Sequence, residues 1–427
     1  MKRASSCSVL IVLITASAVL GACSSGASAP TAAASKVPSQ HGYFVYWDEN
    51  EELDFLATQP PRQAHLIPPW DPNGQMCLMN DGTGRFSVGY NPTVPSQHNP
   101  GGLKPYKQPP IGQAIYDRTG HFTGRTAFVP GPYHLQGQTL GGDIPPEPSG
   151  NFNGNGTYTG CTFDTRDNLL ATDIGTAQGS FPTPSDGRLI EWFAPSYTTY
   201  CILDGPTQGG VGPHHVDGSG GLRQPGMLAI TPAGDLLLAE AGADQSGLPA
   251  GRVLLFDHSS FPKSASQCGP VGLYSASKLH YSVFIQGSLS FLPFPQGIAL
   301  DPVCGCWAVS TIIGNPGVAW FDYGGHQLTN HGVVPGESLS QIGERGGYNP
   351  FGLAFGPDGV LYFTDISIVC ENGSLSKCGP APNGGREMKV TITNRQPSTP
   401  TPFVTGLNFP TSVTVCVPGP RVCPEPR

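Results

Sequence analysis

The sequence predicts an all-β fold, a six-bladed β-propeller, from three observations. A short strand-like pattern, a glycine or arginine followed by apolar residues, recurs six times, with starts at residues 42, 112, 187, 251, 317 and 386. A repeat of this kind indicates a repeated supersecondary unit. Glycine (58) and proline (45) are abundant and charged residues make up only 12%, which suits short strands joined by turns. Beyond the N-terminus, no apolar run has helical spacing.

A second motif alternates with the first and supplies the inner strands of each predicted sheet. It reads proline, a variable residue, glycine or another small residue, an apolar strand, a turn and a second apolar strand. The copies that begin at Pro295 and Pro350 are the clearest, and in the second of them the Pro357-Asp358-Gly359 turn between apolar runs indicates a hairpin. The other copies begin at Trp70, Thr159, Pro225 and Pro410.

The two ends of the chain carry complementary parts of this alternation. Gly42–Asp48 has the pattern of a third strand without an inner pair before it, and Pro410–Val415 has the pattern of a first strand. Pairing these halves completes a sixth blade and removes exposed sheet edges. Residues 41–427 are therefore predicted to form one propeller, closed by N- and C-terminal strands that share one blade. A two-domain β-sandwich is the structural alternative.

The N-terminus has the pattern of an export signal. Lys2 and Arg3 precede an apolar stretch, Val9–Leu20, which is short for a bilayer span. The stretch ends in Leu20-Gly21-Ala22-Cys23, which resembles the bacterial lipoprotein cleavage motif. Residues 1–22 are therefore predicted to be a lipoprotein signal peptide, with ordinary secretion as the alternative.

The predicted anchor and tether follow from this motif. Cys23 is the expected lipidation site, and residues 23–40, rich in Ser, Ala, Pro and Thr, are expected to form a flexible tether. We expect the protein to be extracytoplasmic, lipid-anchored to a bacterial cell membrane or outer membrane. The formal charge of −8 and the lack of a basic cluster disfavour nucleic acid as a partner.

The cysteines agree with export. Without Cys7 and Cys23, ten of the twelve remain, an even number that suggests up to five disulfides. The local pairs Cys370–Cys378 and Cys416–Cys423 would each close a short loop. A metal site at Cys304-Gly305-Cys306 is not expected, because one residue separates the thiols and no second pair has zinc-ligand spacing.

Pro-x-Gly-Ile/Leu-Ala, Pro-Asp-Gly, Leu-Tyr-Phe-Thr-Asp and Gly-Arg-Val-x-x-Phe-Asp together resemble NHL-repeat propellers and the related lactonases of the gluconolactonase and senescence-marker type. For a lactonase, the resemblance implies Asn or Asp metal ligands in the variable slot of Pro-x-Gly. The slots here are assigned to Leu66, Thr159, Gly226, Gln296, Phe351 and Thr411. None is Asp, Asn or Glu, so a metal would lack its oxygen ligands there. No cofactor or metal is predicted, and calcium or zinc is the alternative.

A binding site is expected on the face that carries the long loops, where binding residues are common. The loops are residues 81–110, 131–158, 203–225, 336–350 and 366–385, and they hold Tyr90, His98, Tyr106, Tyr133, His134, His214, His215 and Tyr348. The binding candidates are His214, His215, Tyr348 and Gln296. An exposed histidine pair in a glycine-rich loop is the alternative interpretation of His214-His215.

The catalytic candidates are Asp173, Glu240, Asp365 and His214. The three acids end predicted second strands, as Asp81 and Thr311 are also expected to do. Two such acids could act as acid and base if their environments separated their pKa values. The structural interpretation is that each caps backbone N–H groups of the following loop.

Three function hypotheses follow. The first is a binding module that presents its long-loop face to a small molecule, a glycan or a protein. The second is a lactonase- or esterase-like hydrolase with a non-standard metal site on that face. The third is a quinone-dependent dehydrogenase on the same scaffold.

Overall fold

The computed structural model describes residues 42–49, 52–58, 61–67, 72–90, 112–129, 133–135, 138–140, 158–173, 187–205, 222, 224–241, 251–269, 272–337, 347–370, 378–381, 383–407, 409–419 and 421–425. All of them belong to one compact unit, Pro38–Arg427. The predicted signal peptide, Cys23 and the whole predicted tether, residues 23–40, lie outside the described residues. None of the described helices has the length and apolar character needed to cross a membrane.

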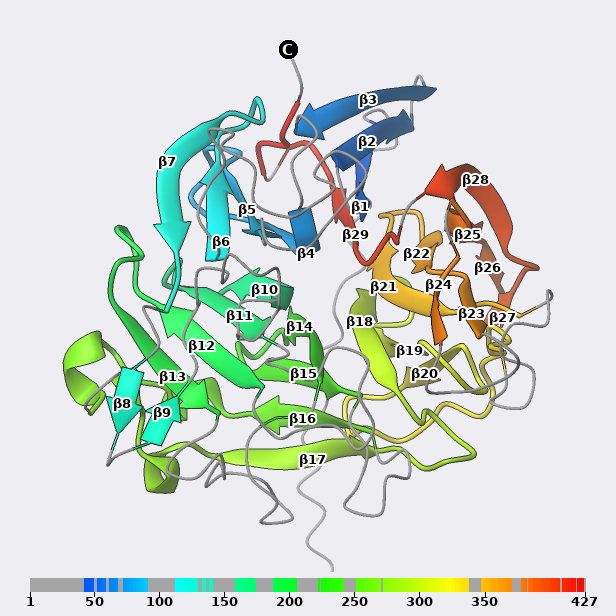
Figure 1. Ribbon diagram of the computed structural model, residues 1–427. Coiled ribbons are helices and arrows are strands. Elements are labelled where there is room, and N and C mark those ends of the chain that lie inside the picture. Colours follow the sequence, from blue (N-terminus) through cyan, green and yellow to red (C-terminus); the bar gives the residue numbers. More distant parts are fainter. Residues whose placement is uncertain are drawn as a thin grey trace, which may run out of the picture. The chain divides into compact units, whose positions relative to one another are not determined.

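The fold is an all-β propeller built from antiparallel sheets (Figure 1). In the part of the chain that the structure describes, five sheets have four strands each: β4 (Pro72–Leu78), β5 (Phe86–Tyr90), β6 (Gly112–Tyr116) and β7 (Phe122–Ala127); β10 (Tyr158–Phe163), β11 (Leu169–Asp173), β12 (Arg188–Trp192) and β13 (Tyr200–Asp204); β14 (Pro225–Ile230), β15 (Leu236–Glu240), β16 (Arg252–Phe256) and β17 (Tyr281–Gln286); β21 (Pro350–Phe355), β22 (Leu361–Asp365), β25 (Gly385–Val390) and β28 (Thr401–Leu407); and β29 (Val413–Cys416), β1 (Phe44–Glu49), β2 (Glu52–Thr58) and β3 (Pro61–Ile67).

A further sheet has three strands, β18 (Pro295–Asp301), β19 (Cys306–Thr311) and β20 (Val318–Phe321). The prediction of six blades with four strands each is therefore confirmed only in part. Five of the described sheets have four strands, and this one has three. In the three-stranded sheet, the described segment after β20 pairs with β20 through two isolated bridges, Val318 with Val334 and Phe321 with Gln327, and forms no regular strand there. This segment replaces a regular fourth strand.

The remaining elements are small. They are the two-stranded pairs β8 (Tyr133–Leu135) and β9 (Gln138–Leu140), β23 (Ile368–Cys370) and β24 (Cys378–Pro380), and β26 (Ile392–Thr393) and β27 (Gln396–Pro397), with the 3-10 helices η2 (His258–Ser260), η3 (Ala265–Gln267) and η5 (Ala276–Lys278).

The strands at the two ends of the unit pair in one sheet, with Phe44 opposite Cys416 and Trp47 opposite Val413. Their order corrects one prediction. Gly42–Asp48 contains the second strand of its sheet, β1, and not the third, since the order is β29-β1-β2-β3. The pattern misled because an apolar run that closes on an aspartate is shared by second and third strands.

The first strands β4, β10, β14, β18, β21 and β29 lie toward the middle, and successive members contact one another (Figure 1). At two of these meeting points the backbones approach so closely that only glycine fits. A Cβ on Gly297 would lie 2.3 Å from Phe351 O, and one on Gly352 would lie 2.7 Å from Ser412 Cα. Hydroxyls bind neighbouring sheets together here: Ser310 Oγ accepts from Gly297 N at 2.8 Å and donates to Phe351 O at 2.7 Å. These contacts explain the Pro-x-Gly motif.

Apolar clusters fill the spaces between successive sheets. One contains Trp47 of β1, Tyr362 of β22 and Leu407 of β28, so it joins the β29 sheet to the β21 sheet. Another contains Tyr46 of β1 and Phe86 of β5, so it joins the β29 sheet to the β4 sheet. Burial of these side chains is the main favourable contribution to the fold.

Disulfides link Cys77 with Cys161, Cys201 with Cys268, Cys304 with Cys306, and Cys416 with Cys423. The predicted Cys416–Cys423 pair is confirmed. Cys370 and Cys378 lie opposite each other in the β23–β24 pair, and their side chains lie outside the described residues.

Candidate functional site

The ends of two second strands carry carboxylates that pair with arginines of the third strands. Asp173 ends β11 opposite Arg188 of β12, whose Nε donates to Asp173 Oδ2 at 3.1 Å. Glu240 ends β15 opposite Arg252 of β16, whose Nε lies 2.6 Å from Glu240 Oε2. All four side chains are buried. Each arginine therefore compensates a carboxylate whose burial alone would be costly.

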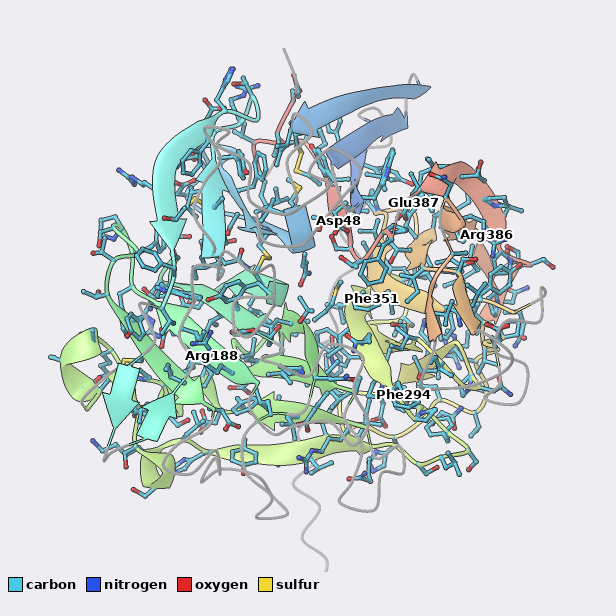
Figure 2. The ribbon with its side chains drawn as sticks, in the orientation of Figure 1. Asp48, Arg188, Phe294, Phe351, Arg386 and Glu387 are labelled. Carbon is cyan, nitrogen blue, oxygen red and sulfur yellow. A yellow bond between two sulfur atoms is a disulfide. The ribbon has the colours of Figure 1, made fainter. Side chains whose placement is uncertain are left out.

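Asp365 at the end of β22 has the same kind of partner, Arg386 of β25. It also accepts hydrogen bonds from Asn349 N at 3.0 Å and from Ser367 N at 3.1 Å. The ring of Tyr348 lies 5.7 Å from Arg386 Cζ. Two predicted site residues, Asp365 and Tyr348, thus both contact Arg386, an arginine that the sequence reasoning did not single out. Figure 2 labels Arg386.

Asp48 and Glu387 are buried acids that the candidate set did not include (Figure 2). Asp48 is the second-last residue of β1 and accepts hydrogen bonds from Thr411 N at 3.1 Å, Thr411 Oγ1 at 2.6 Å and Ser412 N. Burial, and then the charges of Asp48 and Asp365, raise the pKa of Glu387 well above its usual value. The raised pKa favours the protonated form of Glu387 over a further negative charge beside Asp48 and Asp365.

The slot assignments need one correction. Leu66 lies in β3, a fourth strand. The residue after the first proline of β4 is Asn73, because Pro72 pairs with Tyr90 as Pro350 pairs with Asp365. The prediction missed this because the register shift of β4, from Pro72 to Met76, is one residue longer than that of β21, from Pro350 to Leu353. The side chain of Asn73 lies outside the described residues.

Gln296 is buried, and its Oε1 has no hydrogen-bond partner among the described residues. Asp81 does not end a second strand: it lies in the turn between β4 and β5, where it pairs with Arg85. His214 and His215 lie outside the described residues.

The starts of the first strands meet a cluster of apolar side chains, called the apolar end. It consists of Met227 of β14, Phe351 of β21, and Ile366 and Ile368 beyond β22, with Ile312, Ile313 and Phe409 packed against them. Figure 2 marks Phe351 on β21. Because these side chains offer no oxygen or nitrogen ligands, they do not provide a site for a hard cation.

The ends of the first strands border a cavity of ≈ 590 Å³, called the polar cavity. Its wall comes from β4, β10, β14 and β29 and the segments that follow them: Gln75, Met76, Cys77, Leu78, Asn80, Cys161, Thr162, Phe163, Asp164, Thr165, Ile230, Thr414, Val415 and Arg421. Its volume is in the range of small-molecule sites. The Cys416–Cys423 disulfide ties the segment with exposed Arg421 to β29.

Behind this wall lies a charged network. Asp164 Oδ2 lies 3.0 Å from His258 Nε2 and 2.9 Å from Arg166 Nε. Burial opposes ionisation of Asp164, but the hydrogen bonds from His258 and Asn168 N and the Arg166 charge outweigh it, so its pKa lies below the usual value. Asp164 is therefore ionised and already engaged, which leaves Arg421 as the exposed charge among the described wall residues.

Glu191 belongs to the same network, with its Oε1 2.9 Å from an Arg166 amino group and 2.7 Å from Asn168 Nδ2. Burial raises the pKa of Glu191 to about 7, although Arg166 and Asn168 favour the ionised form. The prediction missed this network because its members come from two sheets. The available signal was Asp164-Thr165-Arg166-Asp167-Asn168 between two apolar runs, which is rich in turn-forming and charged side chains.

No protein-family model and no curated protein matches the chain. Solved structures similar to it include a chain of a nidogen/laminin complex, with 11% identity, 88% of this chain and 98% of that chain covered, and a TM-score of 0.48. A gluconolactonase from Xanthomonas campestris has 12% identity over 74% of this chain and 76% of its own, with a TM-score of 0.42. Virginiamycin B lyase from Staphylococcus aureus has 11% identity over 87% of each chain, with a TM-score of 0.43. These similarities concern the fold alone, and they do not assign the activity of any of these proteins to this chain.

Proposed function

We propose that the protein is a binding propeller of six blades, closed into a ring by the shared β29-β1-β2-β3 sheet. The contacts of β29 with both β21 and β4 support closure. So do the two apolar clusters that flank the shared sheet. The three-stranded β18 sheet would be the sixth blade, with a fourth strand reduced to bridges.

The ligand would be a small polar molecule with an anionic group, held in the polar cavity. The observation that carries this proposal is the composition of the cavity wall. Arg421 is its exposed charged residue, and the wall also contains the hydroxyl and amide side chains of Thr162, Thr165, Thr414, Gln75 and Asn80. An arginine fork recognises carboxylate and phosphate groups. The long-loop face, with Tyr348, would serve a glycan or a protein partner instead.

Titration calorimetry with three ring-matched sugars tests the proposal. We expect glucuronate to bind more tightly than glucose, and glucosamine to bind least, because only glucuronate carries the charge that Arg421 attracts. Arg421→Gln is expected to remove the preference for glucuronate. Arg395→Gln, a charge change outside the cavity wall, is the control. Equal affinity for all three sugars, or a preference that survives Arg421→Gln, would contradict the proposal.

A lactonase- or esterase-like hydrolase stays the alternative function. The proposal disfavours it because Asp173, Glu240 and Asp365 are paired with arginines. Metal analysis and a panel of lactones distinguish the two. Stoichiometric calcium or zinc whose removal abolishes turnover would establish the hydrolase and overturn the binding module.

We also propose export and lipid attachment at Cys23, from the N-terminal motif alone. Labelling with a radioactive fatty acid in a bacterial host is expected to mark the full-length protein and to fail with Cys23→Ser. Incorporation that survives this substitution would refute the proposed attachment point.

A further inference from the structure

Cys304 lies in the turn between β18 and β19, Cys306 is the first residue of β19, and the two form a disulfide across one residue, Gly305. Gly305 has a φ of +62°, a conformation that glycine adopts at low cost. Cys306 is buried, whereas the neighbouring Val303 is 75% exposed. The disulfide is therefore close to the surface of its sheet.

His331 comes from the irregular segment that replaces the fourth strand of this sheet. It is only 7% exposed, and its ring stacks on Trp320 with a centroid separation of 5.5 Å and an interplanar angle of 18°. Neither ring nitrogen has a hydrogen-bond partner among the described residues. Buried polar atoms without partners are uncommon and call for an explanation.

The explanation lies in what the imidazole approaches. A ligand nitrogen of His331 and the sulfurs of Cys304 and Cys306 all lie within 4.8 Å of one another. In the described part of the chain, this is the one group of three or more His, Cys, Asp or Glu side chains with such spacing. Two sulfurs and an imidazole nitrogen are soft-metal ligands.

We propose that reduction of the Cys304–Cys306 disulfide creates a three-coordinate site for copper(I), with the two thiolates and the His331 nitrogen as ligands. A dithiol reductant would transfer two electrons to the disulfide, leaving two thiols on the protein and a disulfide on the reductant. Binding of copper(I) then releases one proton from each thiol. In the oxidised protein the sulfurs are bonded to each other, and the site is closed.

The choice of cation follows from the ligand set. Thiolate and imidazole ligands suit copper(I) and zinc, whereas calcium and magnesium need oxygen ligands. Structural zinc takes four ligands, and this group supplies three. Imidazole binds metals through a ring nitrogen in its neutral form, and both ring nitrogens of His331 are without a hydrogen-bond partner among the described residues.

The experiment uses the purified full chain treated with a dithiol. Alkylation followed by mass spectrometry is expected to mark Cys304 and Cys306 while the chain remains folded by circular dichroism. Competition with a chromogenic copper(I) chelator is then expected to show one bound copper(I) per chain and a near-ultraviolet thiolate-to-copper absorption. Untreated protein is expected to bind none at this site.

Variants separate this site from other sulfurs. His331→Leu is expected to weaken copper(I) binding by at least about tenfold, since even groups outside the ligand shell have that effect. Cys304→Ser with Cys306→Ser is expected to abolish it. His326→Leu, an exposed histidine on the same segment that bonds with Asp322, is the matched control and should leave affinity unchanged.

Three outcomes would overturn the proposal. The first is a Cys304–Cys306 disulfide that resists the dithiol in the folded chain. The second is copper(I) affinity that His331→Leu does not change. The third is copper(I) binding that follows Cys416 and Cys423, so that Cys416→Ser with Cys423→Ser removes it and the Cys304/Cys306 variant does not.

Discussion

The two ends of the first strands differ in chemistry although the same strands form both. At the apolar end, Met227, Phe351, Ile366 and Ile368 pack together, and the nearby acids of the second strands are paired with arginines. At the other end, the polar cavity has hydroxyls, amides and the exposed Arg421 in its wall.

This difference shows that the role of a charged residue depends on whether an oppositely charged side chain is paired with it, which the residue type alone does not reveal. Asp173 and Glu240 are the acids that a search for catalytic groups selects, yet they lie buried against Arg188 and Arg252. Arg421 has no motif around it, yet it is an exposed charge in a cavity wall. The predictions below break or sharpen the contrast.

The largest effect is expected from Arg188→Met. The substitution leaves the Asp173 carboxylate buried without its arginine, which costs about 3–5 kcal/mol of unfolding free energy. Denaturant unfolding measures the loss. Arg85→Met, which removes the partner of the more exposed Asp81, is the control and is expected to cost about 1 kcal/mol or less. Equal losses of unfolding free energy in the two variants would show that the buried Asp173–Arg188 pair stabilises the fold no more than the more exposed Asp81–Arg85 pair does.

A loss of about 3 kcal/mol is expected from Phe351→Ala, because truncation leaves a cavity in the apolar end. Phe351→Leu keeps most of the apolar volume and should cost about 1.5 kcal/mol or less. Thermal and denaturant unfolding compare the two. If both variants were as stable as the wild type, the apolar end would not be a packed part of the fold.

Asp204 at the end of β13 should make stability depend on pH. Burial, and then the charge of Glu240, raise the pKa of Asp204 to about 8 from its usual value of 3.8. The folded state therefore binds the Asp204 proton more tightly than the unfolded state does. This contribution to the free energy of unfolding is fully present below pH 3.8 and is lost as the pH rises toward 8. Between the two values the slope is about 1.4 kcal/mol per pH unit.

Denaturant unfolding in one-unit steps of pH measures this slope, and Asp204→Asn is expected to remove its share of it. An unchanged slope in Asp204→Asn would assign the pH dependence to other groups.

The smallest stability effect is expected at the polar cavity. Thr414→Val removes the hydrogen bond from Thr414 Oγ1 to Met76 O, 2.8 Å long, at a cost of about 1 kcal/mol. Because Thr414 is also in the cavity wall, glucuronate affinity is expected to fall as well. Calorimetry and unfolding on the same sample separate the two effects. A loss of unfolding free energy as large as that of Arg188→Met would contradict this prediction and show that Thr414 stabilises the fold as much as the buried carboxylate–arginine pairs do.

Much of the fold could be predicted from the sequence because close backbone packing leaves a local mark. Pro-x-Gly recurs where first strands meet, since Gly297 and Gly352 cannot carry a Cβ there. The place of β1 was wrong because second and third strands share an apolar pattern. The Leu66 slot was wrong because a register shift in β4 breaks the spacing.

The candidate site could be predicted less well, because its partners are distant in the chain. Register alone would have placed Arg188 opposite Asp173 and Arg252 opposite Glu240, and the Gly-Arg pairs were visible in the repeat. In contrast, His331 meets Cys304 and Cys306 only through an irregular segment, and no spacing rule anticipates that.

The most direct test of the central claim is a crystal structure of the chain soaked with glucuronate. The account predicts electron density for the sugar acid in the polar cavity, with its carboxylate on Arg421 and its hydroxyls near Thr162 and Thr414. Density at the apolar end, beside Gln296 or the Asp173–Arg188 pair, would contradict the account.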